Sequence, residues 1–186
     1  MIGSGDLRKG IIVEIDGELY QVLDYHHIKL GRGSAQIRLK LRGIHAGHTI
    51  ERSFQSSEKF IRADLDYRHM QYLYNDADLY YFMDEENYEQ ITLPASQLGD
   101  ALHYLKEGMS LEVSSYNGQV LGVELPAAVE LKVINTGPDF KGDTATAASK
   151  PATLETGITI QVPLFVNTGD IIKVDTRTGA YLERVS

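Results

Sequence analysis

Apolar and polar residues alternate along much of this chain, and glycine and other turn residues interrupt the alternation at short intervals. A period of two predicts strands that are buried on one face. Short strands separated by turns every 8–12 residues are typical of small antiparallel barrels. We therefore predict an all-β protein. Strands are predicted over 35–42, 49–54, 70–74, 79–83, 88–93, 129–133 and 158–166.

Three segments repeat one pattern: an apolar strand, a polar turn containing glycine, and a second strand. They span 9–22, 107–123 and 168–185, and each predicts a β-hairpin. They lie too far apart for a solenoid repeat. We therefore assign one hairpin to each of three small barrels, over 1–64, 65–127 and 128–186. The alternative is one large β domain that contains three unrelated hairpins.

Two segments depart from this pattern. Ser96 is a suitable N-cap for a short helix that ends near Leu105, with Gly108 just beyond its end. Leu98 and Leu102 lie on the same face of that predicted helix as Leu105. Residues 135–150 are rich in Gly, Ala, Thr and Ser and predict a long loop, which in a compact domain is usually functional.

Basic residues concentrate in the first barrel. Arg32 lies between Gly31 and Gly33, a pattern that predicts a tight turn with a cation at its tip. Lys29 precedes this turn, and the strand after it carries Arg38, Lys40 and Arg42 on its polar face. A solvated hairpin face is the alternative interpretation of this stripe.

The chain as a whole is acidic, with a net charge of −8 over 186 residues. Residues 1–62 carry ten Lys and Arg against seven Asp and Glu, whereas 63–186 carry eight against nineteen. This distribution favours a first domain that touches a polyanion and an acidic body that avoids indiscriminate RNA binding. There is no cysteine, no apolar leader and no apolar stretch long enough to span a bilayer. We expect a soluble, cytoplasmic protein.

No group of residues predicts a catalytic or metal centre. His45 and His48 lie on a predicted turn without a carboxylate at ligand spacing. Asp84, Glu85, Glu86 and Glu89 resemble paired catalytic carboxylates, but they follow a strand as a solvated turn. The eleven tyrosines resemble a base-stacking platform, yet most lie in the acidic middle segment, which favours core and edge aromatics.

The last third of the chain carries the motifs that identify a family. KPATLETG at 150–157 continues to VPLF at 162–165, with VELKV at 129–133, KGDT at 141–144 and IKVDTRTG at 172–179 in order around it. QYLY at 71–74, FMD at 82–84 and KLGRG at 29–33 extend the match. Over essentially its whole length, the chain resembles bacterial elongation factor P.

The resemblance implies an SH3-like, KOW-type domain followed by two OB-folds, in an L-shaped arrangement that imitates tRNA. It implies a translation elongation factor, without enzymatic activity or cofactor, that binds the ribosome between the P and E sites beside peptidyl-tRNA. Such a factor promotes peptide-bond formation at polyproline stalls. The expected partners are the ribosome, its rRNA and the P-site peptidyl-tRNA, with no membrane partner, and we expect a monomer.

The resemblance also gives candidate site residues. Gly31, Arg32 and Gly33 would approach the CCA end of the P-site tRNA. The expected tRNA or rRNA contacts are Lys29, Arg38, Lys40, Arg42, Tyr181 and Arg184. The segment Gly142, Asp143 and Thr144 would approach the E-site codon or the small subunit.

The tip of the first domain departs from the family pattern. Many members carry a β-lysylated lysine there, which Arg32 excludes because that reaction needs an amine. Others carry a rhamnosylated arginine, usually followed by Asn, where this chain has Gly33. We therefore expect Arg32 to be unmodified; a rhamnosylated Arg32 would add a tip-modifying enzyme to the partners.

Two other functions compete with this interpretation. One is a general RNA-binding protein that acts away from the ribosome, which predicts a basic OB face with interleaved aromatics. The other is a carboxylate-dependent hydrolase, which predicts that Asp84 or Glu86 is essential. The acidic second and third domains do not favour the first, and the solvated position of the acidic turn does not favour the second.

Overall fold

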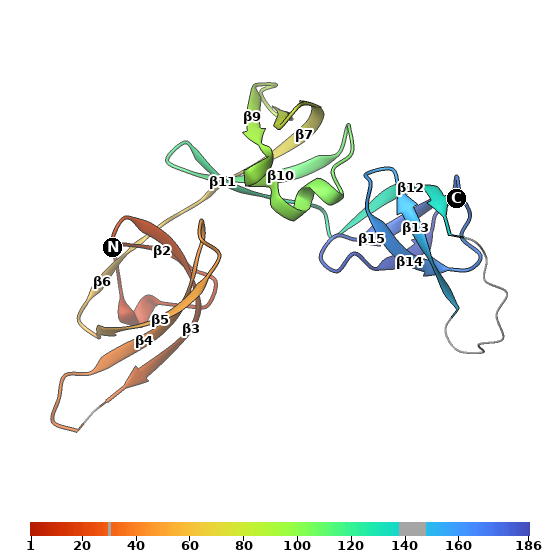
Figure 1. Ribbon diagram of the computed structural model, residues 1–186. Coiled ribbons are helices and arrows are strands. Elements are labelled where there is room, and N and C mark those ends of the chain that lie inside the picture. The colour runs from red at the N-terminus through yellow and green to blue at the C-terminus, as the bar shows by residue number, and fades with distance from the viewer. Residues whose placement is uncertain (30, 138–147) are drawn as a thin grey trace. The chain divides into compact units, whose positions relative to one another are not determined.

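The computed structural model describes residues 1–29, 31–137 and 148–186, and within them the strands form three separate sheets (Figure 1). The first sheet has the order β1-β6-β2-β3-β4-β5, and all its pairs are antiparallel. Its strands are β1 Ile2–Gly3, β2 Ile12–Ile15, β3 Glu18–Ile28, β4 Gln36–Gly43, β5 Thr49–Gln55 and β6 Lys59–Arg62, with a 3-10 turn at Ser4–Asp6.

The second sheet has the order β11-β10-β7-β8-β9, and the third has the order β14-β13-β12-β15-β16. The strands of the second are β7 Asp66–Asp76, β8 Leu79–Asp84, β9 Gln90–Pro94, β10 Ser110–Tyr116 and β11 Gln119–Glu124. Those of the third are β12 Ala128–Thr136, β13 Ser149–Leu154, β14 Thr159–Pro163, β15 Ile171–Asp175 and β16 Tyr181–Arg184. Every pair in the third sheet is antiparallel.

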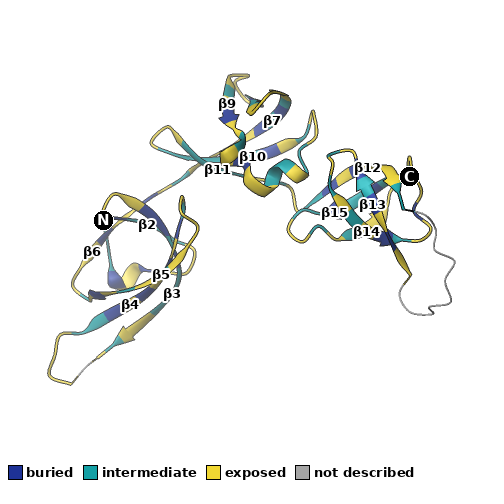
Figure 2. Ribbon diagram, in the orientation of Figure 1, coloured by how far each residue is buried: buried dark blue, intermediate teal, exposed yellow. Residues whose placement is uncertain are grey.

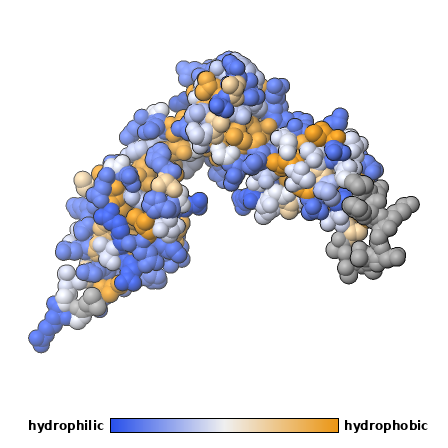
Figure 3. Space-filling model, viewed as in Figure 1, coloured by the Kyte–Doolittle hydropathy of each residue, from blue (hydrophilic) through white to orange (hydrophobic). Residues whose placement is uncertain are grey.

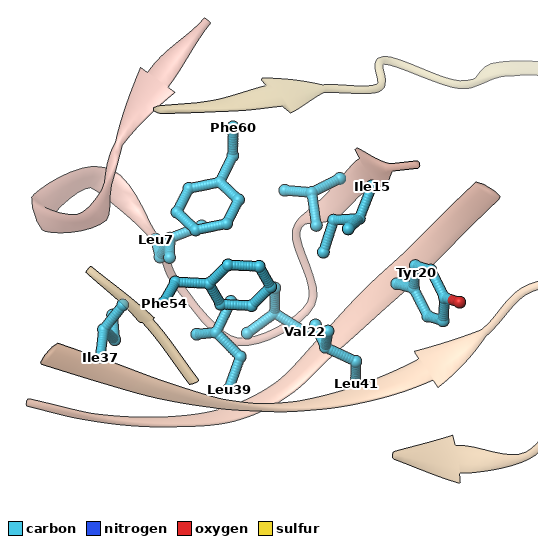
Figure 4. Packing of buried hydrophobic residues seen from close by; sticks show 10 residues of the cluster. Leu7, Ile15, Tyr20, Val22, Ile37, Leu39, Leu41, Phe54 and Phe60 are labelled. Carbon is cyan, nitrogen blue, oxygen red and sulfur yellow. The ribbon is translucent and has the colours of Figure 1, made fainter. Parts of the chain in front are cut away.

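The described residues divide into two compact units, one made of 1–66 with 115–121 and the other of 67–114 with 122–186. The first unit has a core under the first sheet, shown in Figure 4. In it the rings of Phe54 and Phe60 meet edge to face, with centroids 5.1 Å apart. Burying each such side chain contributes about 1.5–3 kcal/mol relative to exposure, so this core anchors the strands that carry the basic segment.

The second unit contains the third sheet and most of the second. Tyr104 and Met109, which follow β9, pack against the core of the third sheet. Lys106 Nζ lies 3.1 Å from a carboxylate oxygen of Glu155, and the Thr176 hydroxyl donates to the carbonyl of Pro126 at 2.6 Å. These contacts link the two sheets of this unit through both apolar and polar groups.

Each sheet contains one of the three predicted hairpins: β2–β3, β10–β11 and β15–β16. The first turns at Asp16 and Gly17 with φ of +53° and +81°, and the second at Asn117 and Gly118 with φ of +50° and +78°. Two successive positive φ values are the geometry that suits the twist of a tight hairpin. The three separate sheets confirm the predicted all-β fold of three small β units, and the alternative of one large β domain with three unrelated hairpins is wrong. The domain boundaries near 64 and 127 remain a prediction.

The predicted helix over 96–105 is wrong in its length and its cap. The α-helix covers Ala95–Leu98 and then gives way to a 3-10 segment at Gly99–His103. Its N-cap is Pro94, which makes no side-chain cap bond. Gly99 has a φ of +52°, which an α-helix cannot accommodate, so the helix stops there. Leu98 is nevertheless buried, as its place on the apolar face predicted.

The predicted loop over 135–150 is too long at both ends. β12 continues to Thr136, and β13 begins at Ser149. The proline at 151 argues against a central strand, yet it lies one residue beyond the last registered pair with β12, Thr136 with Ala152. Its carbonyl accepts a hydrogen bond from the Gly137 N–H at 2.9 Å, so the missing N–H falls at the end of the ladder, just beyond β12. β14 ends at Pro163, earlier than predicted.

Candidate functional site

The β3–β4 hairpin carries the basic turn (Figure 1). Its last registered pair is Ile28 with Gln36, so the turn lies between these two residues. Gly31 has a φ of +46°, and a Cβ built there meets no atom within 4 Å. Arg32 and Gly33 are exposed in the turn, and Figure 3 shows hydrophilic residues over the end of this hairpin. The turn presents the guanidinium of Arg32 to solvent with open space beside it.

The two faces of β4 have opposite chemistry, and Figure 2 shows burial varying along this strand. Ile37, Leu39 and Leu41 are 0% exposed and pack in the core of the first unit. Arg38, Lys40 and Arg42 alternate with them and are exposed. The buried face fixes the register of the strand, because a slip by one residue would place the cations in the core. The cationic face is therefore held in a defined position.

Within the described residues, the fold does not use the side chains of these cations. In the part of the chain that the structure describes, no hydrogen bond or ion pair engages the side chains of Lys29, Arg32, Arg38, Lys40 or Arg42. A cation without an intramolecular partner keeps its hydrogen-bond donors for an external anion. Among the described residues, intramolecular bonds therefore leave the donors of these side chains unoccupied.

The cross-strand register makes the three cations of β4 unequal. Their neighbours on β3 and β5 are His26 and Ser53 for Arg38, Asp24 and Glu51 for Lys40, and Gln21 and Thr49 for Arg42. Lys40 thus has a carboxylate residue directly opposite on each side. The two arginines face uncharged polar residues or a histidine.

Asp24 is the centre of a small polar network on this face. Its carboxylate lies 3.4 Å from Lys9 Nζ and 3.4 Å from His26 Nε2, and it accepts a hydrogen bond from the backbone N–H of Tyr25 at 3.0 Å. The backbone bond from Tyr25 and the hydrogen bond from Lys9 lower the pKa of Asp24 below its ordinary value. Asp24 is therefore ionised at neutral pH.

The C-terminal candidates lie on β16 in the second unit. Tyr181 is half-buried and packs against the core of the third sheet. Arg184 lies over the ring of Phe165, 5.3 Å from its centroid, and its Nη1 is 3.6 Å from an Asp170 carboxylate oxygen. The same nitrogen approaches the carbonyl of Phe165 at 3.5 Å. Unlike the cations of β4, Arg184 already has intramolecular partners.

Hydrogen bonds and an ion pair engage the carboxylates of the acidic turn after β8. Asp84 is 4% exposed, accepts a backbone hydrogen bond from Glu86 at 2.8 Å, and pairs with Arg68 at 3.5 Å. Glu85 accepts a hydrogen bond from the Ser110 hydroxyl. These contacts assign structural roles to Asp84 and Glu85. Among the described residues, no group of three or more His, Asp and Glu side chains is placed to hold a metal ion.

The tyrosines of the middle sheet divide between core and surface. Tyr72 is 5% exposed and packs against Phe82 with ring centroids 5.5 Å apart. Tyr74 is 48% exposed and stacks on Tyr81 at 4.6 Å with an interplanar angle of 15°. The core interpretation holds for Tyr72, whereas Tyr74 and Tyr81 form a stacked pair at the surface.

Several contributors to these sites were not predicted. Asp24 and Glu51 flank Lys40 through the register of three strands, and Phe165 and Asp170 engage Arg184 from outside its strand. The pattern of each strand alone carries no signal for such pairings. Gly142, Asp143 and Thr144 lie outside the described residues, so their predicted role stays a prediction.

Three family models match successive parts of the chain. They are described as the Elongation factor P (EF-P) KOW-like domain over residues 4–60, the Elongation factor P (EF-P) OB domain over 65–123, and Elongation factor P, C-terminal, over 129–184. The first match contains the β3–β4 hairpin, and the third contains Tyr181 and Arg184. The predicted KOW-type and OB architecture is confirmed by these matches.

Curated relatives match over the full length. An elongation factor P from Thermoanaerobacter sp. is 54% identical over 185 residues, which cover 100% of both chains. One from Moorella thermoacetica is 53% identical and covers 99% of this chain and 100% of the relative. The solved eukaryotic translation initiation factor 5A from Methanococcus jannaschii is 27% identical with a TM-score of 0.54, covering 66% of this chain and 92% of that one.

A second solved structure, a translation initiation factor eif-5a family protein from Naegleria fowleri, is similar in fold. It is 18% identical with a TM-score of 0.53, covering 67% of this chain and 96% of that one.

Within the described residues, no helix has the length and apolar character needed to cross a membrane.

Proposed function

The chain belongs to the elongation factor P family, whose members are translation factors and not enzymes, and on that premise we propose how it acts. It binds the ribosome between the P and E sites, beside peptidyl-tRNA. There it holds the CCA end of that tRNA and promotes peptide-bond formation when consecutive prolines stall synthesis.

The physical problem at such a stall is alignment. Proline has a fixed φ and a secondary amine, so it is a stiff donor and a poor nucleophile. A factor that orders the CCA end pays part of the entropic cost of reaching a near-attack geometry before the chemical step. Such a factor needs rigid positioning and polar contacts, and it needs no catalytic group of its own.

One observation carries the proposal: Arg32 is an exposed arginine at the end of a hairpin whose other end is locked into a buried core. Its guanidinium can bind phosphate in a bidentate manner and can stack on a base. Arg38 and Arg42 on β4 carry further positive charge back from the turn, and contacts to phosphate position a protein without reading sequence. On Tyr181 and Arg184 we place a second contact with the P-site tRNA.

We also propose that Arg32 acts without a covalent modification. The motivation is Gly33, which stands where the rhamnosylated members usually have Asn. Intact-mass measurement of the protein purified from its native host should give the mass of the unmodified sequence. An added deoxyhexose on Arg32 would overturn this part of the proposal.

The decisive experiment is a reporter whose translation requires synthesis of Pro-Pro-Pro. Arg32→Ala should abolish rescue of that reporter, and Arg32→Lys should restore little of it, because an ammonium lacks the planar donor fork. Arg177→Ala, which removes an exposed arginine from the second unit, is the matched control and should rescue like the wild type. Full rescue by Arg32→Ala would exclude Arg32 as the acting residue.

A further inference from the structure

We propose that Asp24 and Glu51 determine how the hairpin binds an RNA backbone: they withhold Lys40 from phosphate, so that β4 offers two separate phosphate sites, at Arg38 and at Arg42. The inference rests on the proposed function, because it takes RNA as the ligand of this face. It concerns which cations bind and in what register.

The charges of successive rows across the sheet support this division. A row here is one β4 residue with its direct neighbours on β3 and β5. The Arg38 row contains one fixed positive charge, and so does the Arg42 row, since Ser53, Gln21 and Thr49 are uncharged. The Lys40 row contains two carboxylates and one ammonium.

Directly opposed residues on one sheet face have Cβ atoms about 4.5–5.5 Å apart. A phosphate that approaches Lys40 is therefore attracted by one ammonium and repelled by two carboxylates at similar distances. The ammonium of Lys9 lies 3.4 Å from the carboxylate of Asp24 and offsets one of the two negative charges. The middle row is then close to neutral, and it separates the two positive rows.

The spacing of Arg38 and Arg42 sets the distance between the two proposed phosphate sites. They lie four residues apart on one face of β4, which at about 3.4 Å per residue places them about 14 Å apart. A continuous basic stripe lets a nucleic acid slide, because every position along it is equivalent. Two positive rows with a neutral row between them favour registers in which two phosphates meet two guanidinium groups.

A β-bulge places the carboxylate of Asp24 opposite Lys40. On β3, Val22 pairs with Leu41, but the next registered pair is Asp24 with Lys40, so Leu23 is the extra residue. Without the bulge, Leu23 would lie opposite Lys40. Bulges commonly re-aim side chains in this way. The hydrogen bond from the Tyr25 N–H to the Asp24 carboxylate then helps to hold that group on the outer face.

The test measures the affinity of the full-length protein for ribosomes stalled with a proline-ended peptidyl-tRNA in the P site, over a series of salt concentrations. Arg38→Gln and Arg42→Gln should each weaken binding and lower the slope of log K against log salt by about 0.7–0.9, the value for one released counterion. Lys40→Gln should lower that slope by less than about a third as much. Equal losses for all three variants would overturn the inference.

A second set of variants tests whether removing a carboxylate opposite Lys40 makes its ammonium group available to phosphate. Glu51→Gln should tighten binding and steepen the salt dependence, and it should do so in the wild-type background but not in Lys40→Gln. A gain that persists in the Lys40→Gln background would be a general charge effect, which contradicts the inference. Thermal melting of every variant checks that these exposed substitutions leave the fold intact.

The two proposals fail in different ways. If the wild-type protein neither binds the stalled ribosome nor rescues the Pro-Pro-Pro reporter, the proposed function is wrong. The same variants are then measured against free deacylated tRNA, where the inference still requires Arg38→Gln and Arg42→Gln to cost more than Lys40→Gln. If the wild type binds and rescues, the order of the variants on the ribosome decides the inference alone.

Discussion

The β3–β4 hairpin and the β16 region are both proposed to contact tRNA, yet they differ in how far the fold already uses their chemistry. At the hairpin, Arg32 and Arg38 have no side-chain partner among the described residues. At β16, Arg184 is engaged by Phe165 and Asp170. A substitution at the hairpin should therefore report on ligand binding, whereas one at β16 should report on folding as well.

Two glycines show the same contrast. Gly31 and Gly179 both have positive φ, at +46° and +74°. A Cβ at Gly31 meets open space, whereas a Cβ at Gly179 would lie 3.1 Å from the Tyr104 hydroxyl oxygen. Replacement of Gly31 by a larger residue is therefore opposed by backbone conformation alone. Replacement of Gly179 is opposed both by backbone conformation and by packing within the second unit.

The largest expected effect comes from this difference. Gly179→Ala should destabilise the second unit by about 2–3 kcal/mol, because left-handed backbone strain of about 1–2 kcal/mol adds to the contact with Tyr104. Gly31→Ala should cost the first unit about 1 kcal/mol, since only the strain remains. Calorimetry of both variants measures the shifts.

The control isolates the contact from the strain. Tyr104→Phe removes the hydroxyl group that the new Cβ would meet, so Gly179→Ala should cost less in that background than in the wild type. Equal costs in the two backgrounds would show that packing at Gly179 adds nothing, and the contrast between the two glycines would disappear.

The next effect separates the two arginine sites. Arg184→Ala should destabilise the second unit by about 1 kcal/mol, from the loss of an exposed cation–π contact and a partly exposed ion pair. Arg32→Ala should change stability by less than about 0.5 kcal/mol. Chemical unfolding of both variants, run beside the Pro-Pro-Pro reporter, measures both properties.

Phe165→Leu is the matched test of this interpretation. It keeps an apolar side chain at that position but removes the aromatic face, so Arg184→Ala should cost less when Phe165 is already Leu. If Arg184→Ala leaves stability unchanged while it reduces rescue, Arg184 is as free for tRNA as Arg32 is. The distinction between the two regions would then be wrong.

The sequence predicted those features that depend on local pattern. The alternation at Ile37 to Arg42 was enough to place the cations on one face of a strand, and Asp16-Gly17 was enough to place a tight turn. The helix predicted after Ser96 is wrong because Gly99 adopts a positive φ. Glycine adopts positive and negative φ with similar ease, so its presence in the sequence does not show which one occurs.

Features that depend on register between strands could not be read from the sequence. Asp24 lies opposite Lys40 because Leu23 is bulged, and nothing in the order of residues on β3 marks the bulge. Arg184 meets Phe165 because the segment that follows β14 lies beside β16. The candidate cations were therefore predictable, but the neighbours that decide their availability were not.

The smallest expected effect is a difference in pH dependence between the two regions. Hydrogen bonds from the Tyr25 N–H and from Lys9 lower the pKa of Asp24 from 3.8, so its contribution to stability is present above that value and is lost as pH falls through the folded-state pKa. The hydrogen bond to Glu183, at 2.8 Å, raises the pKa of Lys173 from 10.5. The contribution of Lys173 is present below that value and is lost as pH rises through the folded-state pKa.

The two ion pairs should therefore weaken at opposite ends of the pH range. Below about pH 4, wild type should lose more stability than Asp24→Asn, and the difference should appear in the transition of the first unit. Above about pH 10, wild type should lose more than Lys173→Met, in the transition of the second unit. Calorimetric scans at both extremes give the measurement. Because both pairs are largely exposed, the differences should shrink in high salt, and a difference that salt leaves unchanged would point to packing rather than charge.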